Sequence, residues 1–236
     1  MSECIKALVL SSGGVDSTTC VGWAIQQYGK DNVSSLSVFY GQRHVKEIEC
    51  ALDIARYYAI SHYDVDLSAA MKFSNCNLLA ANKDTIPDKS YVDQAKEDGQ
   101  GRVSTYVPFR NGLMLSAATS IADSLFPGES VALIYGAHAD DAATAAYADC
   151  SPQFAEAMSA AINIGTYGNI SVVAPFIKMN KAQVVAEGTR LKTPYELTWS
   201  CYHGADLQCG RCATCIDRLN AFKQNNITDP VGYEGG

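Results

Sequence analysis

The stretch LVLSSGGVDSTTC, residues 8–20, places the strongest constraint on how this chain can fold. The apolar run that ends at Leu10 is typical of a buried strand, and a helical pattern runs from about Ser17 to Tyr28. Glycines at the turn between them let the backbone approach a ligand closely. The helix that follows begins with unpaired N–H groups and a positive dipole end, which together favour a bound phosphate. Many α/β proteins make such a turn without any ligand, so the glycines alone leave the function open.

Four further apolar runs, each typical of a strand, alternate with helical patterns along the chain. They cover residues 33–40, 62–67, 130–136 and 170–174. This alternation predicts an α/β fold, in which a Rossmann-like open parallel sheet of five strands carries helices on both faces. We expect this domain to occupy residues 1–195 and a small C-terminal segment to occupy residues 196–236. Residues 68–103 lack a regular pattern and are predicted to form a flexible cover over the site, and the tail after Pro230 is predicted to be frayed.

Composition and charge argue against several classes of function. The formal charge is −7 and the pI is about 5.0. A protein that binds RNA usually carries a basic face, so we expect no nucleic acid as substrate. No apolar run approaches the length of a membrane span, and the start MSEC lacks the basic and apolar regions of a signal peptide. Nine cysteines in such a chain indicate reduced thiols or metal ligands, and the expected compartment is the cytoplasm.

The C-terminal segment contains four closely spaced cysteines in the pattern C-x7-C-x2-C-x2-C. Four thiolates suit a tetrahedral zinc ion, and C-x-x-C turns allow successive ligands to reach one ion. An iron–sulfur cluster or a redox pair is compatible with the same spacing. Four sulfurs would saturate a zinc ion and leave no position for water, so we expect a structural site. Its predicted ligands are Cys201, Cys209, Cys212 and Cys215.

Polar residues follow the second and fourth predicted strands, where open α/β sheets bind their ligands. The first group is YGQRH, residues 40–44, which is equally compatible with a solvated loop. Lys181 begins a helix, a position that favours a nearby anion, although a surface lysine explains it equally well. The group after the fourth strand could ligate a metal, recognise the N–H donors of a heterocycle or lie in solvent, and it comprises His138, Asp140, Asp141, Asp149 and Cys150.

The string SGGVDS, residues 12–17, resembles the pyrophosphate loop of ATP pyrophosphatases, which cleave ATP between the α and β phosphates and use AMP to activate an oxygen. A Walker loop is absent from the sequence. Together with later motifs in the same order, the string makes nearly the whole chain similar to the 7-cyano-7-deazaguanine synthase (QueC) family, whose fold is adenine nucleotide alpha hydrolase-like. The chain departs from the family pattern at Ala148, where proline is usual, and at Ser151, where arginine is frequent. The later motifs are YGQRH at 40–44, VPFRN at 107–111, YADC at 147–150 and LTWSC at 197–201.

The resemblance implies an enzyme that converts 7-carboxy-7-deazaguanine, ammonia and ATP into 7-cyano-7-deazaguanine, with Mg²⁺, structural Zn²⁺ and a homodimeric assembly. Transfer of AMP to the carboxylate would make a mixed anhydride, ammonia would give the amide, and a second adenylation would give the nitrile. Arg110 and Lys181 are the expected catalytic groups, and Asp16 would help position Mg²⁺. The nucleotide site would comprise Leu10, Ser11, Ser12, Gly13, Gly14, Val15, Asp16, Ser17, Thr18 and Thr19. The substrate would contact Tyr40, Gln42, Arg43, His44, Asn111, His138, Asp141, Tyr147, Asp149 and Cys150.

Three other functions remain open on the sequence. A variant that stops at the amide is compatible with the altered loop before Ser151. A tRNA-modifying enzyme of the same superfamily would need a basic face and a sulfur-delivering cysteine. A nucleotide-binding regulatory module without catalysis would have no need of Asp16, Arg110 and the aspartate-rich loop.

Overall fold

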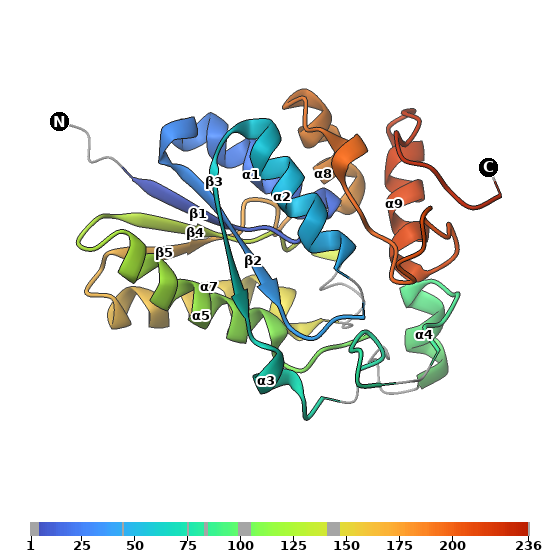
Figure 1. The fold of residues 1–236 in the computed structure, drawn as a ribbon, viewed down its shortest axis with the longest axis horizontal. Coiled ribbons are helices and arrows are strands. Elements are labelled where there is room, and N and C mark those ends of the chain that lie inside the picture. Colours follow the sequence, from blue (N-terminus) through green and yellow to red (C-terminus); the bar gives the residue numbers. More distant parts are fainter. Residues whose placement is uncertain are drawn as a thin grey trace.

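Five parallel strands form the sheet at the centre of the computed structural model, which describes residues 5–43, 45–74, 76–82, 85–98, 105–140 and 147–235. Within these ranges the strands lie in the order β3-β2-β1-β4-β5 (Figure 1). The chain builds outward from β1 through β2 to β3, then returns to add β4 and β5 on the other side of β1. The strands are β1 (Lys6–Leu10), β2 (Val33–Phe39), β3 (Ser61–Asp66), β4 (Val131–Ile134) and β5 (Ile170–Val173).

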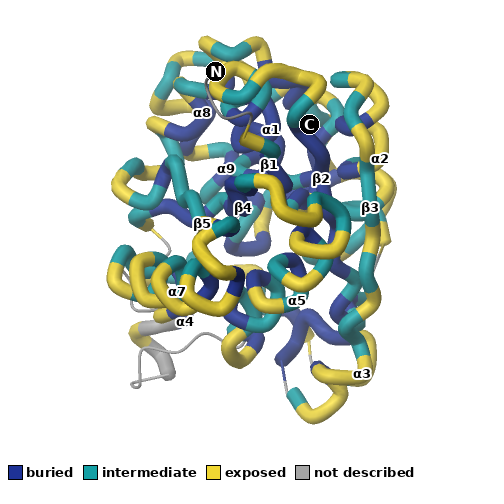
Figure 2. The backbone as a smooth tube through the Cα atoms, turned by 90° about the vertical axis from the view of Figure 1, so that its left-hand side faces the viewer, coloured by how far each residue is buried: buried dark blue, intermediate teal, exposed yellow. Residues whose placement is uncertain are grey.

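Helices cover both faces of this sheet, as predicted (Figures 1 and 2). One face carries α1 (Val15–Tyr28), α2 (Lys46–Tyr58) and α8 (Lys181–Arg190). The other face carries α5 (Arg110–Leu125) and α7 (Pro152–Gly165). The Rossmann-like α/β fold expected from the alternating pattern is therefore confirmed.

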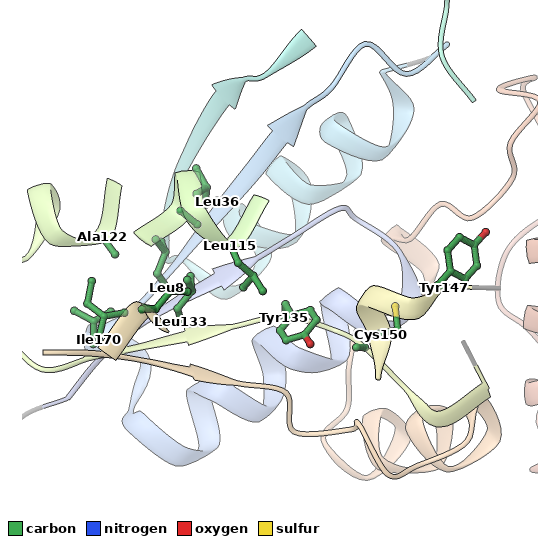
Figure 3. Packing of buried hydrophobic residues seen from close by; sticks show 13 residues of the cluster. Leu8, Leu36, Leu115, Ala122, Leu133, Tyr135, Tyr147, Cys150 and Ile170 are labelled. Atoms are coloured by element: carbon green, nitrogen blue, oxygen red, sulfur yellow. The ribbon is translucent and has the colours of Figure 1, made fainter. Parts of the chain in front are cut away.

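The sheet buries apolar side chains on both of its faces because successive residues of a strand point in opposite directions. Leu8 packs with Leu115 and Leu133 on the side of α5, whereas the neighbouring Ala7 and Val9 pack on the side of α1. Figure 3 shows the first cluster, which extends along the sheet to Tyr135, Tyr147 and Cys150. The last two belong to the short turn η2 (Ala148–Cys150) and its preceding residue, beyond the end of β4.

Two helices lie in the segment that was predicted to lack regular structure, so that prediction is wrong for α3 (Ser68–Met71) and α4 (Tyr91–Asp98). The hydroxyl of Ser90 accepts a hydrogen bond from the N–H of Asp93 at 3.2 Å, which supports the start of α4. The ring of Tyr91 meets that of Tyr147 edge-on at 5.9 Å. This partner is distant in sequence, so local periodicity gives little sign of the helix. Residues 75, 83–84 and 99–104 of the segment lie outside the described residues.

The C-terminal part of the chain is tied back onto the fold. Helix α9 (Ala213–Gln224) packs against α8 and follows the short turn η3 (Tyr195–Leu197). The tail after Pro230, predicted to be frayed, instead pairs with Gln208: the Gln208 N–H donates to the carbonyl of Gly232 at 3.2 Å, and the Glu234 N–H donates to the carbonyl of Gln208 at 2.9 Å. Among the described residues, none of the helices has the length and apolar character that a membrane span requires.

Candidate active site

The glycine-rich turn lies where the order of the strands reverses. Strand β1 lies between β2 and β4, and the chain leaves β1 toward one side for β2 and later returns to the other side for β4. The carboxyl ends of β1 and β4 therefore open onto a crevice. Gly14 caps α1, and the hydroxyls of Ser12 and Ser17 lie 3.2 Å apart inside the turn. The first N–H groups of α1 have no carbonyl partners within the helix. The turn therefore presents hydroxyls and N–H groups to an anion in the crevice.

Two glycines let three segments meet tightly around this turn. Gly13 has a φ of +76°, and a Cβ there would lie 2.2 Å from the carbonyl oxygen of Glu47 in α2. Gly136, just after β4, would place a Cβ 3.1 Å from the backbone of Asp16 and Ser17. Side chains at either position would push α2 or the loop after β4 away from the turn. The glycine loop is thus held in place by its neighbours on both sides.

The carboxylate of Asp16 is ionised and only partly paired. Its Oδ2 accepts a hydrogen bond from Nζ of Lys181 and lies 3.8 Å from Nε2 of His138. Burial alone would raise the pKa of Asp16, but the charges of Lys181 and His138 and the Lys181 hydrogen bond outweigh burial and lower this pKa. Oδ1 is buried and has no hydrogen-bond partner among the described residues. An unpaired carboxylate oxygen beside a phosphate-binding turn fits a Mg²⁺ ligand.

A pocket of about 240 Å³ extends from the glycine loop toward the C-terminal segment. It brings together most of the residues predicted for the nucleotide and the substrate, although they come from many separate elements. Arg110, the first residue of α5, lies over the ring of Tyr40 with its guanidinium carbon 5.5 Å from the ring centroid. The predicted residues that line the pocket are Leu10, Ser11, Ser12, Gly14, Val15, Asp16, Ser17, Tyr40, Gln42, Arg110, Asn111, His138, Tyr147, Cys150 and Lys181.

Five other predicted residues lie outside the lining of this pocket. The Thr18 hydroxyl donates to the carbonyl of Gly14 at 2.7 Å, and the Thr19 hydroxyl donates to that of Val15 at 2.8 Å, so both hydroxyls are engaged in the body of α1. The Arg43 guanidinium donates to the carbonyl of Asn82 at 2.7 Å. The other two residues outside the lining are Gly13 and Asp149. Two further predicted residues, His44 and Asp141, lie outside the described residues.

Asp149 is buried and braces the start of α5. Its Oδ2 accepts the N–H of Asn111 at 2.9 Å, and its carbonyl accepts the Asn111 side-chain amide at 3.2 Å. The same amide nitrogen lies 3.3 Å from Sγ of Cys150. A carboxylate at a helix N-terminus is favourable because the first N–H groups lack partners there. The geometry therefore supports an effect of Asp149 on the pocket through Asn111.

Several pocket residues were missed from the sequence. The described lining also includes Glu47 on α2, Tyr91 on α4, Tyr135 after β4, and Trp199 and Tyr202 from the C-terminal segment. Glu47 lies only a few positions after the YGQRH motif, and that neighbourhood was the one available signal for it. The aromatic residues come from distant segments, and their convergence follows from the tertiary fold.

The four predicted metal ligands converge at the start of α9. All are buried, and their sulfurs lie within 4.8 Å of one another. The sulfurs of Cys209 and Cys215 are 3.9 Å apart, close to the edge of about 3.8 Å that a tetrahedron with metal–sulfur bonds of about 2.3 Å would have. The N–H groups of His203 and Cys209 point at Sγ of Cys201, each at 3.4 Å, as suits a thiolate. These residues fit a tetrahedral metal ion.

The fold and the site together define the class of protein. An open parallel sheet with an anion-binding glycine turn at its switch point is typical of a nucleotide-binding Rossmann-like protein. A structural neighbour, described as NMN synthetase from Francisella tularensis, supports this fold with a TM-score of 0.50, 12% identity, and coverage of 95% of this chain and 79% of that one.

The family follows from sequence similarity over the full length. The family described as "Queuosine biosynthesis protein QueC" matches residues 6–226. A 7-cyano-7-deazaguanine synthase from Marinobacter nauticus is 39% identical over 97% of both chains. Another from Marinomonas sp. is 41% identical over 99% of this chain and 100% of that relative. The chain therefore belongs to the QueC family.

Proposed function

We propose that the protein is an ATP-dependent enzyme that converts 7-carboxy-7-deazaguanine and ammonia into 7-cyano-7-deazaguanine in the queuosine pathway. The observation that carries the proposal is one pocket joining a pyrophosphate-type loop to an aromatic compartment, in a chain whose relatives are named for this product. The acidic balance of the chain favours a small molecule over tRNA as the acceptor, and cytoplasmic location and dimerisation remain predictions from the sequence.

The phosphates of ATP would lie on the turn formed by Ser12, Gly14 and Ser17, where hydroxyls and helix N–H groups converge. When bound, Mg²⁺ would neutralise phosphate charge, and the unpaired oxygen of Asp16 is the ligand that this chain offers it. Lys181, which now pairs with Asp16, is placed to share that interaction with a phosphate. Positive charge held beside the phosphates favours displacement of pyrophosphate.

The deazaguanine ring would occupy the aromatic part of the pocket. Tyr40, Tyr147 and Tyr202 line this part, and flat heterocycles bind well between such rings. The Gln42 amide oxygen accepts the Tyr40 N–H and the Asn111 amide nitrogen donates to Asp149, so the Gln42 nitrogen and the Asn111 oxygen are the amide atoms proposed to pair with the edge of the base. Arg110 lies over Tyr40 in the same pocket and is placed to hold the substrate carboxylate or the α-phosphate.

The chemistry explains why two activations are needed. A carboxylate is a poor electrophile because hydroxide is a poor leaving group, and transfer of AMP to one carboxylate oxygen supplies a better one. Ammonia displaces AMP and gives the amide. A second transfer of AMP, to the amide oxygen, allows that oxygen to leave as part of AMP, and the nitrile forms as the nitrogen loses its protons. The binding of both reactants in one pocket contributes by holding the attacking oxygen near the α-phosphate.

The cysteine cluster has a structural role in this proposal. Four buried thiolates would saturate a zinc ion, so the site offers no open position for catalysis. The cluster instead holds Trp199 and Tyr202 in place. Both residues lie within two positions of Cys201 in the sequence, and both line the pocket. Metal analysis of the purified protein separates zinc from an iron–sulfur cluster.

Mass spectrometry of the reaction products tests the proposal. The protein is incubated with ATP, Mg²⁺, ammonium and 7-carboxy-7-deazaguanine, and the nitrile is expected together with AMP. Accumulation of the amide alone would identify an amide synthetase and direct attention to the loop before Ser151. If neither product forms while the metal-loaded protein still binds ATP, the substrate assignment is wrong.

A further inference from the structure

A carboxylate that the proposed chemistry does not use lies in the wall of the same pocket. Glu47 belongs to the first turn of α2 and lines the pocket together with Arg110 and the glycine loop. The backbone of α2 touches that loop, since a Cβ on Gly13 would meet the carbonyl oxygen of Glu47 at 2.2 Å. Glu47 is therefore held beside the place proposed for the phosphates and the activated carboxyl group.

The surroundings of Glu47 suit a group that exchanges protons near neutral pH. Its side chain makes no hydrogen bond or ion pair with another described residue. Four titratable groups interact electrostatically with the Glu47 carboxyl group. They are Arg110 on α5, Tyr40 at the end of β2, Tyr202 in the C-terminal segment and Cys50 in the next turn of α2. Burial raises the pKa of Glu47 from 4.5 to about 7, although the charge of Arg110 opposes this rise. A general base works best when its pKa is close to the operating pH.

The proposed reaction needs such a base. Ammonium predominates at neutral pH and has no lone pair, so it must lose a proton before it can attack. We infer that Glu47 is the general base that removes this proton beside the activated carboxyl group, an inference that rests on the function proposed above. The described lining contains two other carboxylates, Asp16 and Asp217. Asp16 pairs with Lys181, and Asp217 also has interaction partners, so Glu47 is the carboxylate of this lining that makes no hydrogen bond or ion pair with a described residue.

Glu47 takes one of the two protons that the nitrogen loses in this step. Ammonium gives one proton to the Glu47 carboxylate, and the freed lone pair forms the C–N bond at the carbonyl carbon of the acyl adenylate. The C–O bond to AMP breaks, its electron pair leaves on the AMP phosphate, and the nitrogen loses a second proton to solvent. Glu47 then returns its proton to solvent. The amide remains in the pocket for the second activation.

The test separates activation of the acid from attack by the nitrogen. Glu47→Gln keeps the size of the side chain and removes the base. Activation is measured as acid-dependent exchange of labelled pyrophosphate into ATP, and attack is measured with ammonium and, separately, with hydroxylamine, which is largely uncharged at neutral pH. The variant should retain exchange within about twofold, lose about 100-fold or more of its rate with ammonium, and lose less than about threefold with hydroxylamine. Glu49→Gln, an exposed change on the same helix, is the matched control and should resemble the wild type.

Each contrary result has a distinct meaning. Equal losses with the two nucleophiles would show that Glu47 shapes the pocket and does not act as a base, and a wild-type rate with ammonium would overturn the inference directly. Loss of exchange in the variant would place Glu47 in the activation step and also refute it. Absence of acid-dependent exchange in the wild-type protein would instead refute the proposed function on which the inference depends.

Discussion

Replacement of Asp229 by alanine should destabilise the protein by about 3–5 kcal/mol, because it leaves a fully buried guanidinium without its counter-charge. The side chains of Arg218 and Asp229 are 0% and 3% exposed. Arg218 donates to both carboxylate oxygens, at 2.7 Å from Nε and 2.9 Å from Nη2. The hydroxyl of Tyr233 donates to the same carboxylate at 2.6 Å. The third guanidinium nitrogen, Nη1, donates to the hydroxyl of Thr198 at 2.7 Å, so the pair ties the tail to the segment beside the pocket.

Urea unfolding of the metal-loaded protein measures this loss. With a denaturant slope of about 2.5 kcal/mol per molar, the midpoint should fall by about 1–2 M. Asp206→Ala removes a fully exposed carboxylate from the same segment and should leave the midpoint nearly unchanged. The double variant Arg218→Met, Asp229→Leu replaces both charges with apolar groups and should recover most of the loss. A midpoint for Asp229→Ala within about 0.3 M of the wild type would refute the assigned energetic role of the pair.

Three further outcomes follow from the site. Cys212→Ser should reduce the bound metal and lower the thermal midpoint, whereas Cys20→Ser, at a buried cysteine outside the cluster, should leave the metal content unchanged, as measured by elemental analysis and calorimetry. Asp16→Asn should abolish acid-dependent pyrophosphate exchange but leave the circular dichroism spectrum unchanged; retained exchange would contradict its role toward Mg²⁺. Because the pKa of Glu47 is raised to about 7, its ionisation costs stability as pH rises from 4.5 through 7. Glu47→Gln should therefore gain about 1–3 kcal/mol relative to the wild type between pH 5 and pH 8, and a constant difference would contradict the raised pKa.

The sheet could be predicted from the sequence because each strand is a short apolar run between turn signals. The starts of two later helices also depend on local residues: Ser151 accepts the N–H of Phe154, and Asn180 and Gln183 form a capping box. Helix α4 was missed because its support comes from Tyr147 and Tyr202, far along the chain. Local patterns record which side chains face a core, but they do not record which distant segment supplies that core.

In the candidate site, too, features set by local sequence could be predicted, whereas features set by distant packing could not. Motif spacing was sufficient to predict the glycine turn after β1 and the convergence of the four cysteines, since both depend mainly on local backbone geometry. The prediction of a frayed tail was wrong because the tail is held by tertiary contacts, among them the buried pair of Arg218 and Asp229, which local sequence patterns do not record. Glu47 was missed for a related reason: a glutamate in the first turn of a helix is ordinarily a favourable solvated charge. Its place in the pocket lining becomes visible only in the tertiary structure, in which α2 packs against the glycine loop.

Oxygen-isotope transfer tests the central claim, that ATP activates an oxygen of the substrate by adenylation. The substrate 7-carboxy-7-deazaguanine is labelled with ¹⁸O at both carboxylate oxygens and converted in unlabelled water with ammonium, ATP and Mg²⁺. The proposed chemistry predicts two molecules of AMP for each nitrile, each carrying one ¹⁸O in its phosphate. Unlabelled AMP, or release of ADP, would contradict adenylation of the substrate.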